Sequence, residues 1–173
     1  MVYLAVHTVQ DEHDMQGFRS YLLDQGLWYP HFDRWVETVC VPDIEQQWKT
    51  AILARDRSGD IVGNVVFQAH KELPRTRELK NLRIKDSWRR RDLGHFLLRQ
   101  AEEEAALVDG QRTFDQILCD CDARAEGVLW LLAFSGYREI MRRSLYAAES
   151  MDVILVKDFT KKDSLQTALQ RRN

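Results

Sequence analysis

Three arginines, Arg89 to Arg91, stand between a β-rich segment and an apolar helical pattern that opens at Gly94. A strand that leads through a basic loop into a helix is suited to holding a phosphorylated ligand. The unpaired backbone N–H groups of the first helical turn and the positive end of the helix dipole both attract an anion. This stretch therefore predicts an anion-binding loop, and the alternative is a solvated run of surface arginines.

A carboxylate that could accept a proton lies on the strand leading into this loop. Glu78 could take a proton from an ammonium group, directly or through water. The alternative is a salt bridge with Lys80, which lies on the same strand face two residues on. His70 is a second candidate for the base. Cys119 and Cys121 share a strand face, but no histidine has metal-ligand spacing to them, so core cysteines are favoured over a zinc site.

Aromatic residues gather in the segment that follows the first predicted helix. Trp28, Tyr29 and Phe32 lie within five positions. One interpretation is that these rings pack the lid of the core. The other is that they wall a pocket for an acceptor, since concave binding sites favour aromatic side chains.

The elements that must position these residues alternate between strand and helix patterns. Strands are expected at 2–6, 49–54, 61–68, 78–84, 116–121, 137–140 and 151–156. Helices are expected from Thr8, with Asp11 in a capping box, to about Gly26, then before Pro42, at 94–109, and from Asp122 to about Phe134. The last helix is apolar on nearly all sides and should be deeply buried. This order predicts an α/β protein with a mixed sheet and helices on both faces.

The composition limits the function classes. The chain has 173 residues, 45% of them apolar and 30% charged, and a net charge of -2. We expect one domain over residues 1–158 and a polar tail at 159–173. Near-neutral charge disfavours nucleic acid as a partner. An odd count of three cysteines and the lack of a signal peptide or membrane-spanning segment predict a cytoplasmic protein.

The element order and two motifs resemble the GCN5-related N-acetyltransferase (GNAT) superfamily over roughly residues 2–156. The motifs are Ile84-x3-Trp88-Arg-Arg-Arg-Asp-Leu-Gly94 and Phe134-Ser-Gly-Tyr137. The family's acetyl-CoA signature is Arg or Gln, two residues, Gly, one residue, then Gly or Ala. Arg89 takes its first position and Gly94 its last, while Asp92 replaces the first glycine.

A second register is open for this signature. It begins at Arg91 and makes Gly94 the first glycine, which puts Phe96 where a small residue belongs. The first register is favoured because Leu97 and Leu98 then fall at the family's buried helix positions. In that register Asp92 is also a good N-cap, and its carboxylate is expected to bond to helix amides.

The resemblance implies a GNAT-like fold with a central, twisted mixed sheet of about six to seven strands. It also implies acyl transfer from acetyl-CoA, with no metal, to a primary amine of a small molecule or of a protein lysine or N-terminus. The backbone of Leu82, Arg83 and Ile84 would hold the pantetheine and acetyl group. The pyrophosphate would lie on the loop of Arg89, Arg90, Arg91, Asp92, Leu93, Gly94 and His95.

The resemblance also bears on the proton transfers and on the partners. Glu78 aligns with the catalytic glutamate of some relatives, whereas Leu132 stands where many carry a tyrosine as general acid and Ala125 where an asparagine is common. Trp28, Tyr29 and Phe32 would contact the acceptor amine. A non-catalytic acyl-CoA sensor or a protein-interaction module on the same fold is the alternative. A homodimer is a further expectation, without a membrane partner.

Overall fold

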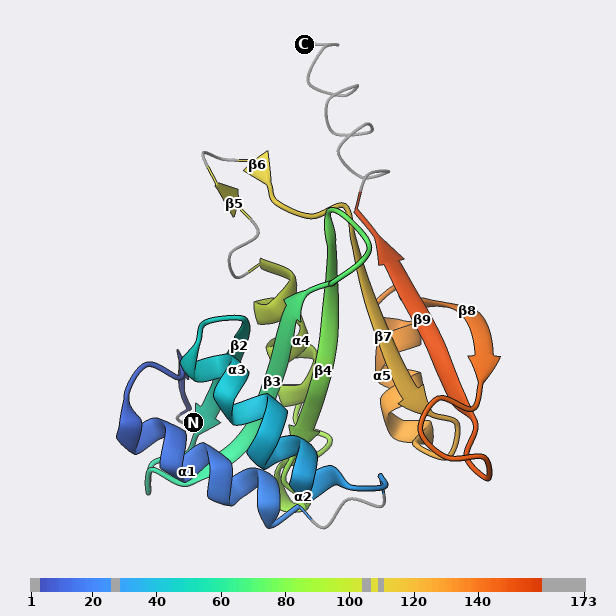
Figure 1. Cartoon of the computed structure of the whole chain (residues 1–173). Coiled ribbons are helices and arrows are strands. Elements are labelled where there is room, and N and C mark those ends of the chain that lie inside the picture. Colours follow the sequence, from blue (N-terminus) through green and yellow to red (C-terminus); the bar gives the residue numbers. More distant parts are fainter. Residues whose placement is uncertain (1–3, 26–28, 104–106, 109–110, 160–173) are drawn as a thin grey trace.

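The computed structural model describes residues 4–25, 29–103, 107–108 and 111–159 (Figure 1). They form a seven-stranded mixed sheet with the strand order β1-β2-β3-β4-β7-β9-β8. Its strands are β1 (Ala5–Thr8), β2 (Lys49–Arg55), β3 (Ile61–Ala69), β4 (Thr76–Ile84), β7 (Gln116–Asp122), β8 (Arg138–Arg143) and β9 (Asp152–Asp158). A separate two-stranded ribbon joins β5 (Leu107–Val108) and β6 (Gln111–Arg112). The predicted mixed sheet is confirmed.

Helices cover both faces of the sheet, as predicted (Figure 1). One face carries α1 (Glu12–Leu23), α2 (Phe32–Trp35), the π-helix η1 (Val36–Cys40) and α3 (Val41–Glu45). The other face carries α4 (Leu93–Glu103) and α5 (Glu126–Phe134), with the short 3-10 helix η2 (Asp86–Trp88) ahead of α4. Successive side chains of β3 point to opposite faces of the sheet. Val65 therefore packs on the face covered by α4, and Val66 packs on the face covered by α1.

The strands β4 and β7 form the parallel pair of the sheet, and this pair is incomplete. Thr76 to Leu79 pair with Gln116 to Cys119, and the pairing ends there. A bulge in β4 falls at the same place, since Val66 lies opposite Asn81 and Phe67 opposite Leu79, which leaves Lys80 unmatched. Figure 1 shows the two strands diverging beyond this point. The backbone of β4 after Lys80 therefore keeps an edge that β7 does not occupy.

One helix start and one helix stop differ from their predictions. Thr8 ends β1 instead of capping a helix, and Asp11 is the N-cap of α1, where its carboxylate accepts a hydrogen bond from the Asp14 N–H at 2.8 Å. The predicted helix stop before Pro42 is also wrong. Pro42 lies in the first turn of α3, directly after the π-helix, where a residue without an N–H is tolerated. The predicted stop at Gly26 lies outside the described residues.

Two boundaries in the second half of the chain also differ. The helix predicted for 94–109 is described only to Glu103, and Leu107 already belongs to β5. Asp122 does not cap α5, because its carboxylate accepts hydrogen bonds from the Arg124 backbone and guanidinium while Ala125 holds the N-cap position. Side-chain competition of this kind is common for aspartate near helix starts.

The deep burial predicted for the last helix is wrong. Leu132 of α5 is buried, but Trp130 and Phe134 are 64% and 72% exposed and stack on each other with ring centroids 5.2 Å apart. The helix packs one side against α4 and the sheet, and nothing in the described part of the chain covers its outer side.

None of the helices in the described residues is long and apolar enough to cross a membrane. The single domain over 1–158 stays a prediction. Of the predicted tail at 159–173, Phe159 is described and is buried against Phe114, with ring centroids 5.4 Å apart. The remainder of that tail lies outside the described residues.

Candidate functional site

The loop between η2 and α4 has an unusual backbone. Arg90 and Asp92 adopt φ values of 59° and 57°, in the left-handed region that favours glycine. A turn with left-handed residues can direct successive N–H groups toward one point and so make a concave anion site. α4 begins at Leu93, directly after the turn. The loop thus brings a concave backbone turn and a helix N-terminus to the same place, which fits a phosphate group.

The three arginine side chains of the loop are all exposed. Arg89 pairs with Asp86 at 2.8 Å, and the Arg91 guanidinium lies 5.2 Å from the centre of the Trp88 ring. Within the described ranges, Arg90 has no ion pair or hydrogen bond from its side chain. Exposed ion pairs are weak and easily exchanged, so all three charges can serve a bound anion.

Asp92 occupies a position whose backbone suits glycine, but its side chain is not used as expected. Its backbone C=O accepts the Phe96 N–H at 2.9 Å, in the helical pattern. Its carboxylate is exposed and makes no hydrogen bond to helix amides among the residues that are described. The expected N-cap bond is therefore wrong, and a free negative charge remains beside the anion-binding turn.

Gly94 serves a close approach between elements. A Cβ atom at this position would lie 3.0 Å from Leu131 Cδ2 of α5 and 3.9 Å from Ile84 Cγ1 of β4. A contact of 3.0 Å is tighter than a methyl group usually makes, so a side chain here would push Leu131 aside, and glycine lets the first turn of α4 pack onto α5 and the end of β4. One turn later Leu97 and Leu98 are buried, as predicted. These contacts fix the helix N-terminus next to the open edge of β4.

That open edge presents backbone rather than side chains. Leu82 and Ile84 turn their side chains into the core beneath α4. Arg83 points to the other face, where its guanidinium donates to the Gln25 C=O at 3.2 Å and burial lowers its pKa. A ligand along residues 82–84 would therefore meet N–H and C=O groups, like an added strand.

Glu78 lies in an ion pair. Its carboxylate accepts Lys80 at 2.5 Å and the Gln68 side-chain amide at 2.8 Å, and both members of the ion pair are mostly buried. The salt-bridge alternative is thus what the structure shows, and a role for Glu78 as base stays a prediction. His70 accepts the N–H groups of Glu72 and Leu73 on Nδ1, each at 3.1 Å, which gives it a role in shaping its own loop.

The aromatic segment lines a cavity of about 400 Å³ on the α2 side of the sheet. Trp28 lies outside the described residues. The Tyr29 hydroxyl accepts the Asp122 N–H at 3.0 Å, which ties this segment to β7. Phe32 is buried and stacks on Trp35 with ring centroids 5.6 Å apart. Core packing is confirmed for Phe32, which also lines the cavity, while a role of these rings in binding an acceptor stays a prediction.

Asp120 is the residue that the sequence analysis missed. It follows Cys119, the last β7 residue paired with β4, and it lines the same cavity. The Tyr146 hydroxyl donates to its carboxylate at 2.7 Å. Burial raises the pKa of Asp120, while the Tyr146 bond and Lys80 oppose the rise. The available signal was a lone acid within the apolar run Ile-Leu-Cys-Asp-Cys.

The cysteines of β7 belong to the core beneath α4. Burial raises the pKa of Cys121 to about 12 and that of Cys119 further, so neither is a reactive thiol near neutral pH. Cys40 is buried as well. In the described part of the chain, no group of three or more His, Cys, Asp or Glu side chains could hold a metal ion.

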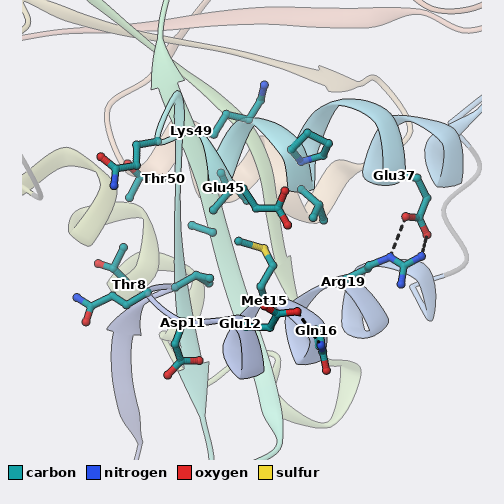
Figure 2. Close-up of a pocket in the computed structure, with 17 residues that line it drawn as sticks. Thr8, Asp11, Glu12, Met15, Gln16, Arg19, Glu37, Glu45, Lys49 and Thr50 are labelled. Atoms are coloured by element: carbon teal, nitrogen blue, oxygen red, sulfur yellow. Dashed lines mark hydrogen bonds and ion pairs between the residues drawn. The ribbon is translucent and has the colours of Figure 1, made fainter.

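A larger cavity of about 1060 Å³ lies between α1 and α3 (Figure 2). Figure 2 shows Met15 on its floor and the paired Arg19 and Glu37 at one end, joined at 2.6 and 2.8 Å. Glu12 accepts the Gln16 side-chain amide at 3.2 Å. The lining residues come from β1, α1, η1, α3, β2 and the segments that join them. This groove includes no residue of β4, β7 or the arginine loop, so it is separate from the opening between those strands.

The site that remains lies where β4 and β7 part, and the two faces of the sheet offer different chemistry there. The α4 face offers an anion-binding turn beside a free strand edge. The α2 face offers an aromatic cavity that the half-buried acid Asp120 helps to line. Such an arrangement can hold an extended, phosphorylated thioester from one side and admit a nucleophile from the other.

Comparison with known proteins identifies the fold. No protein-family model matches the chain, and no curated protein matches its sequence. Solved structures do match. A protein from Desulfovibrio desulfuricans, described as an acetyltransferase of the GNAT family, superposes with a TM-score of 0.75 at 12% identity, over 90% of this chain and 99% of its own.

Two further structures agree. The acetyltransferase of the GNAT family from Streptococcus pneumoniae gives a TM-score of 0.69 at 17% identity, over 91% of this chain and 100% of its own. NAA60 of Arabidopsis thaliana, solved with a bisubstrate analogue, gives 0.71 at 12% identity, over 91% and 99%. At these identities the likeness establishes the fold, and the GNAT-like architecture expected from the sequence is confirmed.

Proposed function

We propose that this chain, which has the fold of the GNAT acetyltransferases, is an acyl-CoA-dependent N-acyltransferase that moves an acetyl group from acetyl-CoA to a primary amine. The observation that carries the proposal is the divergence of β4 from β7 directly beside the left-handed turn of Arg90 and Asp92. A free strand edge and an anion-binding turn lie together, as a pantetheine arm joined to a pyrophosphate requires.

The acyl donor would be held by two groups of residues. The turn and first helical residues from Arg89 to His95 would bind its pyrophosphate through backbone N–H groups and arginine charge. The edge of residues 82–84 would bind its pantetheine, and a backbone N–H there would donate to the carbonyl oxygen as negative charge develops. When bound, acetyl-CoA supplies the activated acyl thioester.

The acceptor amine would enter from the α2 face, where Tyr29 and Phe32 line the cavity. It must lose a proton before its nitrogen can attack. Glu78 is the base implied by the resemblance, and its ion pair with Lys80 would have to open or pass the proton through water. Leu132 is buried and supplies no acid to the leaving group. A thiol with a pKa of about 8.5 leaves tolerably as the thiolate.

The second candidate is a non-catalytic acyl-CoA sensor or a protein-interaction module. Two observations favour it: the free carboxylate of Asp92 beside the phosphate site and the apolar Leu132 where a tyrosine acid is usual. The transferase and the acyl-CoA sensor both need the acyl donor site and differ in turnover, whereas a protein-interaction module needs no acyl donor.

Calorimetry with acetyl-CoA, followed by an assay for free thiol across small amines, peptide N-termini and lysine peptides, separates the two. The transferase predicts saturable binding and thiol release with at least one amine class. Tight binding without release on any of them supports the sensor. Absence of binding refutes the transferase and the sensor and leaves the protein-interaction module.

Location and assembly are part of the same proposal. Three buried cysteine thiols, none in a disulfide, are consistent with the cytoplasm. A homodimer is checked by light scattering of the purified protein. A net charge of -2 disfavours nucleic acid as a partner.

A further inference from the structure

The acceptor cavity has aromatic walls that are held in place by β7. The rings of Tyr29 and Tyr146 meet edge to face, with centroids 5.6 Å apart and planes at 89°. Each hydroxyl contacts β7, Tyr29 by accepting the Asp122 N–H and Tyr146 by donating to Asp120. Trp35 lines the cavity next to the stacked Phe32. Rings fixed in this way are a preformed apolar slot.

A single carboxylate lies among these walls with no cation committed to it. Lys80, which lines the same cavity, is paired with Glu78 at 2.5 Å, and the described contact of the Asp120 carboxylate is the neutral Tyr146 hydroxyl. The negative charges of Glu78 and Asp152 also act on Asp120. His31 and Arg34 line the same cavity, and both are exposed. The inner end of the slot therefore favours a positive charge.

The position of Asp120 along β7 places it at the opening of the sheet. Cys119 is the last residue paired with β4, and Asp120 follows it on the opposite strand face, away from the core beneath α4. An ammonium group on this carboxylate would lie where β4 and β7 begin to diverge. This is the point that an acyl group carried along the β4 edge would reach.

We propose that Asp120 binds the ammonium group of the acceptor and accepts its proton, and that the acceptor is a primary amine with an aromatic or other flat apolar substituent held between Tyr29 and Trp35. This inference rests on the proposed acyl transfer and names its substrate class and its base. Tyr146 is a positioning residue that fixes the carboxylate.

The proton and electron balance is complete with these groups. Asp120 takes one proton from the ammonium, and the freed nitrogen pair forms the C–N bond at the thioester carbonyl carbon. The C–S bond then breaks and its electron pair leaves with sulfur. The second N–H proton is lost as the amide forms, to the thiolate or to water, and Asp120 returns its proton to solvent.

The test uses 2-phenylethylamine as the probe, with spermidine and phenylalanine as comparisons. Calorimetry without acyl donor measures amine binding to the wild type, Asp120→Asn, and the control Asp115→Asn, which changes an exposed aspartate paired with Arg75 at the start of β7. We expect 2-phenylethylamine to bind the wild type and the control equally and Asp120→Asn at least tenfold more weakly. No binding to the wild type, or equal binding to Asp120→Asn, overturns the inference.

Turnover measurements distinguish a role of Asp120 as the base from a purely structural role. With acetyl-CoA present, Asp120→Asn should lose kcat with 2-phenylethylamine at least a hundredfold, yet keep most of its activity with aniline, which is already neutral at the assay pH. Tyr146→Phe should move the acidic limb of kcat/KM to higher pH, because the lost hydrogen bond was lowering the pKa of Asp120. Equal losses on both amines and an unmoved limb refute the role as base.

The comparisons distinguish this inference from the proposed function. Acetyl-CoA binding with turnover of spermidine but of neither 2-phenylethylamine nor phenylalanine refutes the substrate class and leaves the transferase intact. Amine binding that depends on Asp120, in a protein that does not bind acetyl-CoA, supports the slot and refutes the transferase.

Discussion

Replacing Asp92 should tighten the binding of acetyl-CoA. The Asp92 carboxylate is exposed, forms no hydrogen bond within the described residues and adjoins the turn that would cradle pyrophosphate. In water, a unit charge about 7 Å from another interacts by about 0.6 kcal/mol. Two phosphate charges therefore give a repulsion of about 1 kcal/mol, so its removal predicts roughly fivefold tighter binding.

Two substitutions distinguish charge from backbone. Asn tolerates the left-handed φ of 57° as Asp does, so Asp92→Asn removes the charge and keeps the turn. Asp92→Gly removes the charge and also relaxes the backbone. Calorimetry should show the same decrease in Kd for both variants, and this decrease should become smaller as salt is added. Glu103→Gln, at the other end of α4, is the control and should leave Kd unchanged. Unchanged or weaker binding in Asp92→Asn would refute the reasoning.

Three predictions concern stability and are read from urea unfolding. Gly94→Ala should lower the free energy of unfolding by about 1 to 3 kcal/mol, because the new methyl group would lie 3.0 Å from Leu131. The control Gly127→Ala has open space around it and should raise the free energy of unfolding by up to about 1 kcal/mol. Equal effects of the two substitutions would contradict the close approach at Gly94. Asp43→Ala leaves the buried Lys49 ammonium unpaired and should cost about 3 to 5 kcal/mol, and a loss below about 1 kcal/mol would show that the pair contributes little. Asp120→Asn should be more stable than the wild type at pH 7. A carboxyl with a raised folded pKa loses stability as pH rises above its unfolded value of about 3.9, so the difference should vanish in acid, and a pH-independent difference would contradict it.

The sequence predicted the strands and the buried face of α4 better than the surroundings of the aromatic segment. Alternation and turn residues located β2, β3 and β4, and the helical spacing placed Leu97 and Leu98 in the core. The exposed side of the apolar helix α5 could not be predicted from its residue types. Trp130 and Phe134 are exposed because no other described element covers that side. Spacing alone also left Glu78 open between base and ion pair, since a partner two residues along a strand permits both.

The divergence of β4 from β7 is the feature that sequence reasoning could least provide. It depends on a bulge at Lys80 and on how far two distant strands stay in register, neither of which leaves a local pattern. Asp120 is a candidate functional residue only because β4 and β7 diverge beside it. If the two strands stayed paired, Asp120 would be an ordinary polar residue on a solvent-facing side of the strand.

Acetyl-CoA titration of Arg90→Glu tests the anion-binding turn most directly. Arg90 has a left-handed backbone and an exposed side chain, so reversal of its charge should leave the fold unchanged by circular dichroism. Arg99→Glu makes the same charge change farther along α4, at a residue that is 72% exposed. We predict that calorimetry shows saturable binding for the wild type and Arg99→Glu and none for Arg90→Glu. Equal binding in all three proteins would contradict the cofactor site proposed here.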